Sequence, residues 1–403
     1  MNRLKQININ KFMYIIFGMY MFSLVFTSTV LPEISDFCNI ILKLIRYICY
    51  LSFVFKIVLD FKEDKKITFA MIMFTIITFI VFIFTRNKSV VFFYLGLMAF
   101  RKLEIDKLLK IAYNVTFIIF FGIVILSLLG IIPDWTFPRG TLVRHSLGFI
   151  YATDCIGIFL AIILMYFYIK KSKANLLEII AFEFINVVLY KFTDGRLSFI
   201  LITILLSALV LSKIKIIKNI LKSKFIINIM KIMCYSAPVV LLIIFNSLTY
   251  AYSKNYNNID KVDKLLSGRL EFTAKAYEEY GVPIFGKDIK WHGWGGYGYV
   301  NLEEMDEFEY NFVDSSYAKI IFDYGIIYMI LVIFAYQYML RKNFNEKNYW
   351  AVASLLFVLI WSFIEPYIIN LGRNPLILLL IPTLEIKTIN FKNIKEDIER
   401  DTI

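Results

Sequence analysis

Long runs of apolar residues alternate with short polar segments along almost the whole chain. A helix that crosses a bilayer needs about 20 predominantly apolar residues, and most of these runs are close to that length. The runs predict helices at 13–31, 37–59, 67–85, 89–100, 110–131, 147–169, 175–191, 197–213, 230–250, 315–339, 348–369 and 374–387. The runs at 89–100 and 374–387 are the shortest. The pattern therefore predicts an all-α, polytopic integral membrane protein with about twelve transmembrane helices.

The composition supports the bilayer as the solvent of this chain. Hydrophobic residues make up 59% of the 403 residues and charged residues only 19%, whereas soluble domains usually contain about 45–50% apolar residues. So little charge does not cover the surface of a soluble enzyme of this size, and no nucleic-acid partner is expected. The first apolar run, which follows Arg3, Lys5 and Lys11, is long enough to span the membrane, so it is interpreted as a helix rather than as a secretory signal.

The net charge of +12 reflects membrane topology. Cytoplasmic loops of membrane proteins carry an excess of lysine and arginine, and such clusters occur here in every second loop. The predicted cytoplasmic clusters are Lys62, Lys65 and Lys66; Arg101, Lys102 and Lys107; Lys170, Lys171 and Lys173; residues 213–224; and Arg341, Lys342 and Lys347. The opposite short loops contain scattered basic residues, namely Arg86, Arg139, Arg144, Arg196 and Arg373. Both termini are therefore expected in the cytoplasm and the protein in the cytoplasmic membrane.

This topology divides the chain into four parts. Residues 1–250 contain the first nine predicted helices with short loops, and residues 315–387 contain the last three. Between them lies one large extracytoplasmic loop, 251–314, whose length is usually a sign of function. Residues 388–403 form a lysine-bearing cytoplasmic tail.

The large loop is expected to be structured. Helical spacing of apolar residues predicts a helix over 262–280, which Gly281 and Pro283 then end. A glycine- and aromatic-rich piece follows, and it includes Trp291 and Trp294. These rings are suited either to stacking on sugars or to packing on the bilayer surface.

Four polar segments gather on the predicted extracytoplasmic side. They are 138–149 with Arg144 and His145, Asp194-Gly-Arg196-Leu-Ser198, Ser267-Gly-Arg269-Leu, and Asp314-Ser-Ser-Tyr317. A guanidinium keeps its charge and binds two phosphate oxygens at once, so these arginines are candidates for binding a lipid-linked diphosphate. The alternatives are helix capping or contact with lipid headgroups for Arg144 and Arg196, and a solvated helix face for Arg269. Asp314 precedes a predicted helix and is either a catalytic carboxylate or its N-cap.

Three other polar residues are candidates for the site. Lys43 and Arg46 lie three residues apart on one face of the second predicted helix, where each charge costs about 2.5–3.5 kcal/mol at the bilayer centre. They either face the protein interior or extend to the headgroups. His145, one of 2 histidines, is either structural or catalytic. The sequence contains neither HExxH nor GxxxxGK[ST], so no metal or other cofactor is expected.

The polar segments, in this order, resemble those of Wzy-type polysaccharide polymerases in the O-antigen ligase and polymerase superfamily. The Arg196 segment is similar to the first external arginine loop of that family, and the Arg269 segment to the second, although Gly281 follows one position later than in the family. Asp314 with Gly325 resembles a segment in which the ligases carry a histidine first. The aspartate therefore favours a polymerase. The resemblance covers residues from about 85 to 370 in layout.

The resemblance implies a GT-C-like membrane glycosyltransferase. The donor is a polyprenyl-diphosphate-linked oligosaccharide, and the hydroxyl of a second lipid-linked repeat unit displaces polyprenyl diphosphate from the anomeric carbon. Arg196, Arg269 and Arg144 then bind the diphosphate, with Asp314 as the first candidate for general base and His145 as the second. The other candidates for substrate binding are Lys43, Arg46, Trp291, Trp294 and Tyr317. The implied partners are membrane lipid, a flippase and a chain-length regulator protein.

Two other functions fit parts of the sequence. A flippase for the same lipid-linked oligosaccharide has a comparable number of helices, but such transporters usually show two similar halves and short loops. No half-to-half similarity is evident here, and the large loop is long. A ligase that transfers a finished glycan to another acceptor is disfavoured by the aspartate at position 314.

Overall fold

The structure is a computed structural model that describes residues 2–63, 67–139, 141–215, 223–293, 311–385 and 388–389. Helices dominate these residues, which confirms the all-α prediction. The α-helices are α1 (Asn2–Phe26), α2 (Leu31–Ile34), α3 (Asp36–Glu63), α4 (Phe69–Thr85), α5 (Lys88–Ala99), α6 (Ile105–Leu128), α7 (Ala152–Lys170), α8 (Leu176–Thr193), α9 (Arg196–Leu211), α11 (Lys224–Ser253), α12 (Ile259–Leu265), α13 (Arg269–Tyr280), α14 (Ser316–Tyr324), α15 (Ile326–Asn345) and α16 (Tyr349–Trp361). The 3-10 helices are η1 (Lys171–Lys173) and η3 (Pro375–Glu385), and the strands are β1 (Ile67–Thr68), β2 (Thr136–Arg139), β3 (Leu142–His145) and β4 (Thr388–Ile389).

Several of these helices have the properties of membrane spans. Four helical segments among the described residues are long and apolar enough to cross a bilayer, namely Asn8–Phe26, Ile105–Leu128, Ala152–Lys173 and Lys224–Ser253. Shorter apolar helices are Phe69–Thr85, Lys88–Ala99, Arg196–Leu211 and Tyr349–Trp361. Large apolar side chains are exposed on α3, α8 and α11, as at Leu51, Leu177 and Phe225. Such an apolar surface is typical of contact with lipid.

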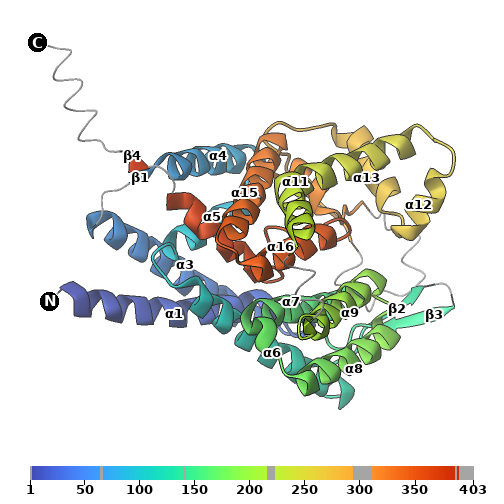
Figure 1. Cartoon of the computed structure of the whole chain (residues 1–403), viewed down its shortest axis with the longest axis horizontal. Coiled ribbons are helices and arrows are strands. Elements are labelled where there is room, and N and C mark those ends of the chain that lie inside the picture. The colour runs from blue at the N-terminus through green and yellow to red at the C-terminus, as the bar shows by residue number, and fades with distance from the viewer. Residues whose placement is uncertain are drawn as a thin grey trace, which may run out of the picture.

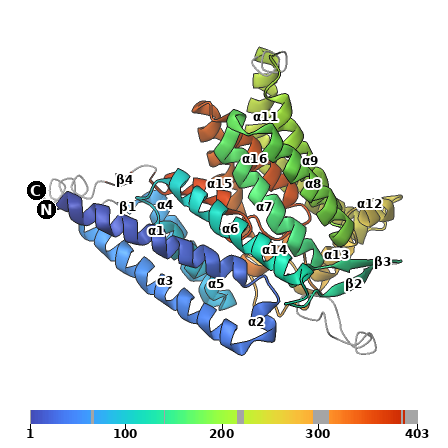
Figure 2. The same ribbon diagram turned by 90° about the horizontal axis from the view of Figure 1, so that it is seen from below.

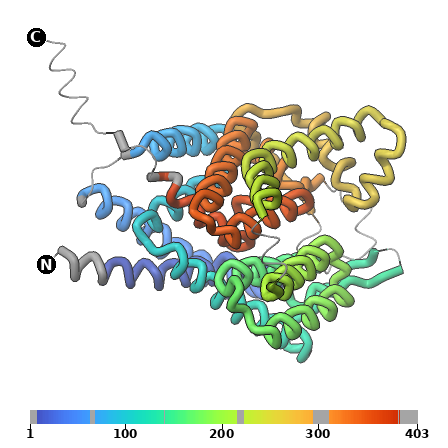
Figure 3. Tube along the Cα trace, in the orientation of Figure 1, coloured from blue at the N-terminus to red at the C-terminus, as the bar shows by residue number. Residues whose placement is uncertain are grey.

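Helix α7 lies at the centre of the bundle, where it packs against α6, α8, α9 and α16 (Figure 1). Its residues 155–168 are all buried, as expected for a helix that is apolar on every face. Helices far apart in the chain also lie side by side, since α4 contacts α14 and α15 (Figure 3). Helices α7, α8 and α9 pack against one another, and this packing brings the start of α7 close to the α8–α9 turn, where polar segments meet.

The predicted helix at 315–339 is interrupted, because Gly325 separates α14 from α15. Gly325 has a φ of +91°, which L side chains rarely adopt, and a Cβ at this position would lie 2.2 Å from the carbonyl oxygen of Ile284. The segment after α13 fills the gap, since the N–H of Ile326 donates to the carbonyl oxygen of Pro283 at 3.0 Å. The periodicity of apolar residues does not reveal this break, because a distant segment produces it.

Replacing Gly325 with alanine is therefore expected to destabilise the fold. The strained backbone costs about 1–3 kcal/mol for a residue with a side chain, and the contact with the carbonyl oxygen adds to this cost. Gly122→Ala in α6 is a matched control, since nothing lies within 4 Å of a Cβ built there. In detergent, the melting temperature should fall clearly for Gly325→Ala and stay near the wild-type value for Gly122→Ala. Equal melting temperatures would contradict a rigid junction at Gly325.

A second break divides the predicted helix 262–280 into α12 and α13. Ser267 and Gly268 have φ values of +59° and +82°, which turn the chain between the two helices. The carboxylate of Asp263 then accepts the N–H of Leu270 at 2.8 Å and satisfies a free donor at the start of α13. Arg269 is consequently the first residue of α13.

Other predicted boundaries also differ from the structure. The run 348–369 is α-helical only to Trp361, and the run 374–387 forms the 3-10 helix η3 instead of an α-helix. Pro382 lies inside this run and lacks the N–H donor that the interior of an α-helix requires. The predicted loop before α7 contains the antiparallel hairpin β2–β3.

Candidate functional site

A cavity of about 1080 Å³ lies where the polar segments meet. Figure 2 shows the β2–β3 hairpin, α12 and α13 at the end of the bundle away from the start of α1. The hairpin, the start of α7, the α8–α9 turn, the α12–α13 turn and the segments around Trp291, Asp314 and Glu365 line the cavity. The fold thus brings together Arg144, Arg196, Arg269 and Asp314, the residues singled out in four separate segments of the sequence.

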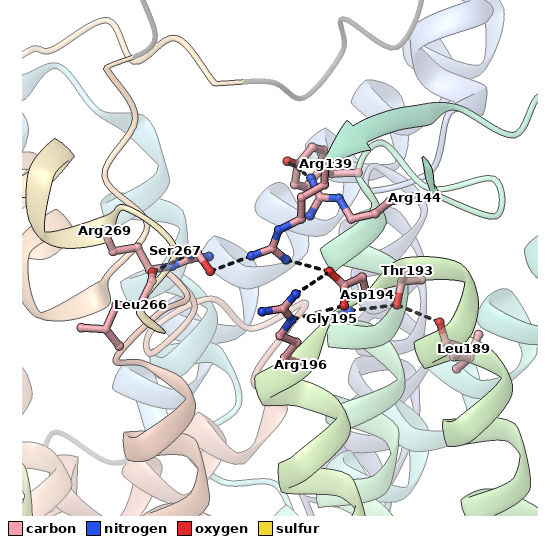
Figure 4. A network of polar contacts seen from close by, with 11 residues as sticks. Arg139, Arg144, Leu189, Thr193, Asp194, Gly195, Arg196, Leu266, Ser267 and Arg269 are labelled. Atoms are coloured by element: carbon pink, nitrogen blue, oxygen red, sulfur yellow. Dashed lines mark hydrogen bonds and ion pairs between the residues drawn. The ribbon is translucent and has the colours of Figure 1, made fainter. Parts of the chain in front are cut away.

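Asp194 holds two arginines at one wall of this cavity (Figure 4). It ends α8 in the left-handed conformation, with a φ of 47°, and Gly195 leads directly into α9. One carboxylate oxygen lies 3.1 Å from Nη1 of Arg139, and the same carboxylate contacts Arg196 at 3.3 and 3.4 Å. Because two guanidiniums share one carboxylate, this wall keeps an excess positive charge that attracts anions.

Arg139 also connects two walls of the cavity. It is the last residue of β2, and its Nη2 donates to Oγ of Ser267 in the α12–α13 turn at 3.0 Å (Figure 4). Burial lowers the pKa of Arg139, and the neighbouring cations Arg144, Arg196 and Arg269 lower it further, against the effect of Asp194. A guanidinium stays protonated at neutral pH, so the lowered pKa reflects first the burial of Arg139 and then the nearby positive charges, whose repulsion a bound anion relieves.

Arg144 is a buried arginine in the same wall. It lies on β3 opposite Phe137, its Nη2 donates to the hydroxyl of Tyr151 at 2.7 Å, and its guanidinium lies 5.2 Å from the centre of that ring. Its Nε is buried and has no hydrogen-bond partner among the described residues. A buried donor without a partner costs about 1–3 kcal/mol, so this position favours a bound acceptor.

Arg269 is held rigidly on the opposite side of the cavity. Its Nε donates to the carbonyl oxygen of Ile364 at 2.9 Å, and its Nη1 donates to that of Leu266 at 3.1 Å. Its Nη2 lies 3.5 Å from Oδ2 of Asp314. The two backbone acceptors fix the plane of the guanidinium, which therefore presents its remaining edge to Asp314 and the cavity.

Asp314 faces the cavity as an ion-paired carboxylate. Burial raises its pKa, whereas the positive charges of Arg269 and Lys319 act against this rise. Ser315 is the N-cap of α14, because its side chain accepts the N–H of Tyr317 at 3.3 Å. The alternative interpretation of Asp314 as the N-cap is therefore wrong, and its carboxylate is free of that role.

A further ion pair, between Arg373 and Asp154, borders the cavity. Nη2 of Arg373 lies 2.8 Å from Oδ1 of Asp154, and Nη1 donates to the backbone carbonyl oxygen of the same residue at 3.0 Å. The hydroxyl of Tyr367 donates to the Asp154 carboxylate at 2.9 Å. Glu365 is also buried and is one of the residues that line the cavity.

Trp291 lines the cavity and is fixed by its own contacts. Its Nε1 donates to Oδ1 of Asp323 at 2.6 Å, and Nζ of Lys319 lies 3.9 Å from the centre of its ring. The same ammonium lies 3.4 Å from Asp323 and 4.5 Å from the centre of the Phe312 ring. One face of the indole is therefore covered by a cation, and the rings of Tyr280, Phe312 and Phe322 also contact it, so Trp291 is part of an aromatic cluster beside the cavity.

His145 is not among the described residues that line the cavity. Its Nδ1 lies 2.6 Å from Oδ2 of Asp134, and the other carboxylate oxygen of Asp134 accepts the N–H of Leu147 at 2.7 Å. These contacts close the base of the β2–β3 hairpin. The structure therefore favours the structural interpretation of His145 over the catalytic one.

Other predicted site residues also lie away from the cavity. Tyr317 is a fully buried core residue whose hydroxyl donates to the carbonyl oxygen of Leu359 at 2.8 Å. Lys43 is exposed and Arg46 half-buried on α3, and neither is among the described residues of the cavity lining. An interior position for these two cations is thus not observed. Trp294 lies outside the residues that the structure describes.

The site includes carboxylates to which the sequence analysis assigned no role. Asp194 and Asp154 pair with arginines at the cavity, and Glu365 lines it without being part of any predicted motif. Asp154 is the sole charged residue in the apolar run 147–169, and Glu365 is the sole one in the run 348–369. An ionisable residue within an apolar run is a functional candidate by default, so the signal was present in the sequence.

No group of three or more His, Cys, Asp or Glu side chains among the described residues is arranged to hold a metal ion. Comparison with family models, with curated proteins and with solved structures gave no match to this chain. The activity of the site is therefore inferred from its side chains. Several guanidiniums can bind an anion, and the carboxyl groups can transfer protons.

Proposed function

We propose that this chain polymerises polyprenyl-diphosphate-linked oligosaccharide repeat units into a surface polysaccharide, as Wzy-type polymerases do. The observation that carries the proposal is a cavity lined by Arg139, Arg144, Arg196, Arg269 and Asp314 at one end of a bundle of apolar helices. Guanidiniums bind diphosphate oxygens in pairs, and a lipid diphosphate approaches such a site from the bilayer. The adjacent carboxylates supply groups for proton transfer.

The size and charge of the cavity also support this function. Its volume of about 1080 Å³ exceeds the usual range of small-molecule sites, about 300–1,000 Å³, and leaves room for sugar residues beside a diphosphate. Arg139 and Arg196 share Asp194, so the positive charge on their wall is only partly neutralised. A site of this charge favours an anionic leaving group over a neutral sugar alone.

In the proposed reaction, the hydroxyl of the acceptor unit attacks the anomeric carbon of the donor while the bond to polyprenyl diphosphate breaks. Arg139, Arg144 and Arg196 bind the diphosphate oxygens and stabilise the charge that develops on them. Asp314 accepts the proton of the attacking hydroxyl, and Arg269 orients its carboxylate through the contact at 3.5 Å. Holding both lipid-linked units in one cavity removes most of the entropic cost of bringing them together.

The proposal includes an orientation in the cytoplasmic membrane. The chain crosses the bilayer about twelve times in a GT-C-like arrangement, with both termini in the cytoplasm. The cavity then lies on the extracytoplasmic side, where the lysine clusters of the sequence are absent. On that side a flippase supplies the lipid-linked unit, and a chain-length regulator protein acts on the growing product.

The decisive experiment uses purified protein in liposomes, supplied only with a polyprenyl-diphosphate-linked repeat unit. A polymerase should produce a ladder of products that differ by one repeat unit, and free polyprenyl diphosphate should be released in step with each addition. A flippase would move the lipid across the bilayer without extending it, and a ligase would require a different acceptor. Absence of the ladder from folded, reconstituted protein would reject the proposed function.

A further inference from the structure

Glu365 is one of several carboxyl-bearing residues that line the cavity with Asp314, and hydrogen bonds hold its backbone in place. It follows the end of α16, and only 7% of the residue is exposed. Its backbone carbonyl oxygen accepts a hydrogen bond from Oγ of Ser316 at 2.5 Å, and Oγ of Ser316 accepts the N–H of Ile368 at 3.2 Å. These bonds tie the segment to the start of α14, beside Asp314. Glu365 is thus a buried residue of the cavity lining whose backbone is held in place.

The charged groups that face Glu365 come from several parts of the chain. They are Arg269 on α13, Asp314 before α14, Asp154 on α7, and Arg373 with Tyr367 in the segment that follows Glu365 itself. Both arginines already have carboxylate partners, because Arg269 contacts Asp314 at 3.5 Å and Arg373 contacts Asp154 at 2.8 Å. Among the ion pairs of the described part of the chain, Glu365 takes part in none.

The surroundings of Glu365 and Asp314 favour different protonation states of the two carboxyl groups. Burial raises the pKa of Glu365 to about 8; Asp314 and Asp154 contribute to the rise, and Arg269 and Arg373 oppose it. Glu365 therefore holds a proton at neutral pH. Burial raises the pKa of Asp314 as well, but the guanidinium of Arg269, 3.5 Å away, and the ammonium of Lys319 oppose this rise and favour its ionised form. Two carboxyls in one site with opposite protonation are the arrangement of a general acid and a general base.

We propose that Glu365 is the general acid of the glycosyl transfer, acting opposite Asp314 as general base. This assignment rests on the proposed function. The hydroxyl oxygen of the acceptor forms a bond to the anomeric carbon and gives its proton to Asp314. The bond between the anomeric carbon and the diphosphate oxygen breaks, and Glu365 transfers its proton to the departing diphosphate. The proton on Asp314 then returns to Glu365, so that one proton has moved from the hydroxyl to the diphosphate.

The experiment compares the pH dependence of polymer formation by the wild type and by Glu365→Gln. Glutamine is uncharged, like the protonated glutamate, so the variant should fold, but it has no proton to transfer. Its rate should fall by about 10²–10⁴-fold at neutral pH, with little change in KM for the lipid-linked donor. The wild-type rate should decrease as the pH rises through about 8, and the variant should lack this decrease. Glu33→Gln, at an exposed position on α2, is the matched control and should behave as the wild type.

A second measurement tests the protonation of Glu365 without turnover. The infrared difference between the wild type and Glu365→Gln should contain the carbonyl band of a protonated carboxyl group at neutral pH, and the band should disappear above a pH of about 8. If the ladder forms and Glu365→Gln retains the wild-type rate and pH profile, the acid role is refuted while the polymerase stands. If the wild type forms no ladder, the polymerase function and the catalytic role of Glu365 are both refuted, even if the infrared band disappears with rising pH as expected. Absence of the band refutes the protonated carboxyl directly.

Discussion

Replacing Arg196 with lysine is expected to reduce the rate of polymer formation by about 10²–10³-fold, the loss typical when one donor that stabilises a developing anion is removed. Lysine keeps the positive charge but loses the planar fork that binds two phosphate oxygens. The side chain of Arg196 is 62% exposed and contacts Asp194 at 3.3 Å, so it contributes little to folding. The rate of ladder formation should therefore fall while the melting temperature stays unchanged.

Two comparisons make this result specific. Arg86→Lys replaces an exposed arginine that is not among the described residues of the cavity lining, and it should retain the wild-type rate. Arg269→Lys should lose activity and also lower the melting temperature, because Arg269 bonds the backbone carbonyls of Ile364 and Leu266. If Arg196→Lys forms polymer as fast as Arg86→Lys, Arg196 does not bind the diphosphate.

The Asp314→Asn variant is expected to lose about 10²–10⁴-fold in rate, the usual contribution of a general base. Asparagine keeps the shape of the side chain and an oxygen that accepts from Arg269, but it does not take up a proton from the acceptor hydroxyl. A base acts only when it is ionised, so the wild-type rate should decrease as the pH falls through the pKa of Asp314, which burial raises. The asparagine variant should lack this acidic limb of the pH profile.

The control for Asp314→Asn is Ser315→Ala, which removes the N-cap of α14. Loss of an N-cap costs about 1 kcal/mol of stability, so Ser315→Ala should melt at a lower temperature but keep most of its rate. Asp314→Asn should show the opposite pattern. A folded Asp314→Asn protein with a near-wild-type rate would exclude Asp314 as the base.

The positions of most helices follow from the sequence, because an apolar segment in a bilayer satisfies its backbone hydrogen bonds as a helix. The predicted run 110–131, for example, corresponds to α6 (Ile105–Leu128). The breaks follow from a different cause. Gly325 lies within an apolar run, where a lone glycine is compatible with a helix, and its conformation depends on the distant backbone of Ile284. Periodicity within one segment contains no information about such a contact.

The candidate site was predictable to a similar extent. The topology predicted from the lysine clusters expects Arg144, Arg196 and Arg269 on one side of the apolar helices, and the structure brings all three to one cavity. Their partners depend on tertiary contacts between distant residues, as when Asp194 pairs with Arg139 of the β2–β3 hairpin. His145 shows the converse, because its position beside Arg144 in the sequence suggested a shared site, whereas the hairpin directs it towards Asp134.

The junction at Gly325 also determines which positions tolerate mutation. The N–H groups of Ile326 and Ile327 donate to the carbonyl oxygens of Pro283 and Ile284 at 3.0 and 3.4 Å. Every amino acid supplies a main-chain carbonyl, and the side chain of Ile284 is exposed. Substitutions at 284 therefore preserve the hydrogen bonds that attach the segment after α13 to the start of α15. Substitutions at 325 abolish this attachment. Selection on this attachment acts on Gly325 and on Gly286, where a Cβ would lie 2.6 Å from the carbonyl oxygen of Asp323, and leaves the residue type at 284 almost neutral.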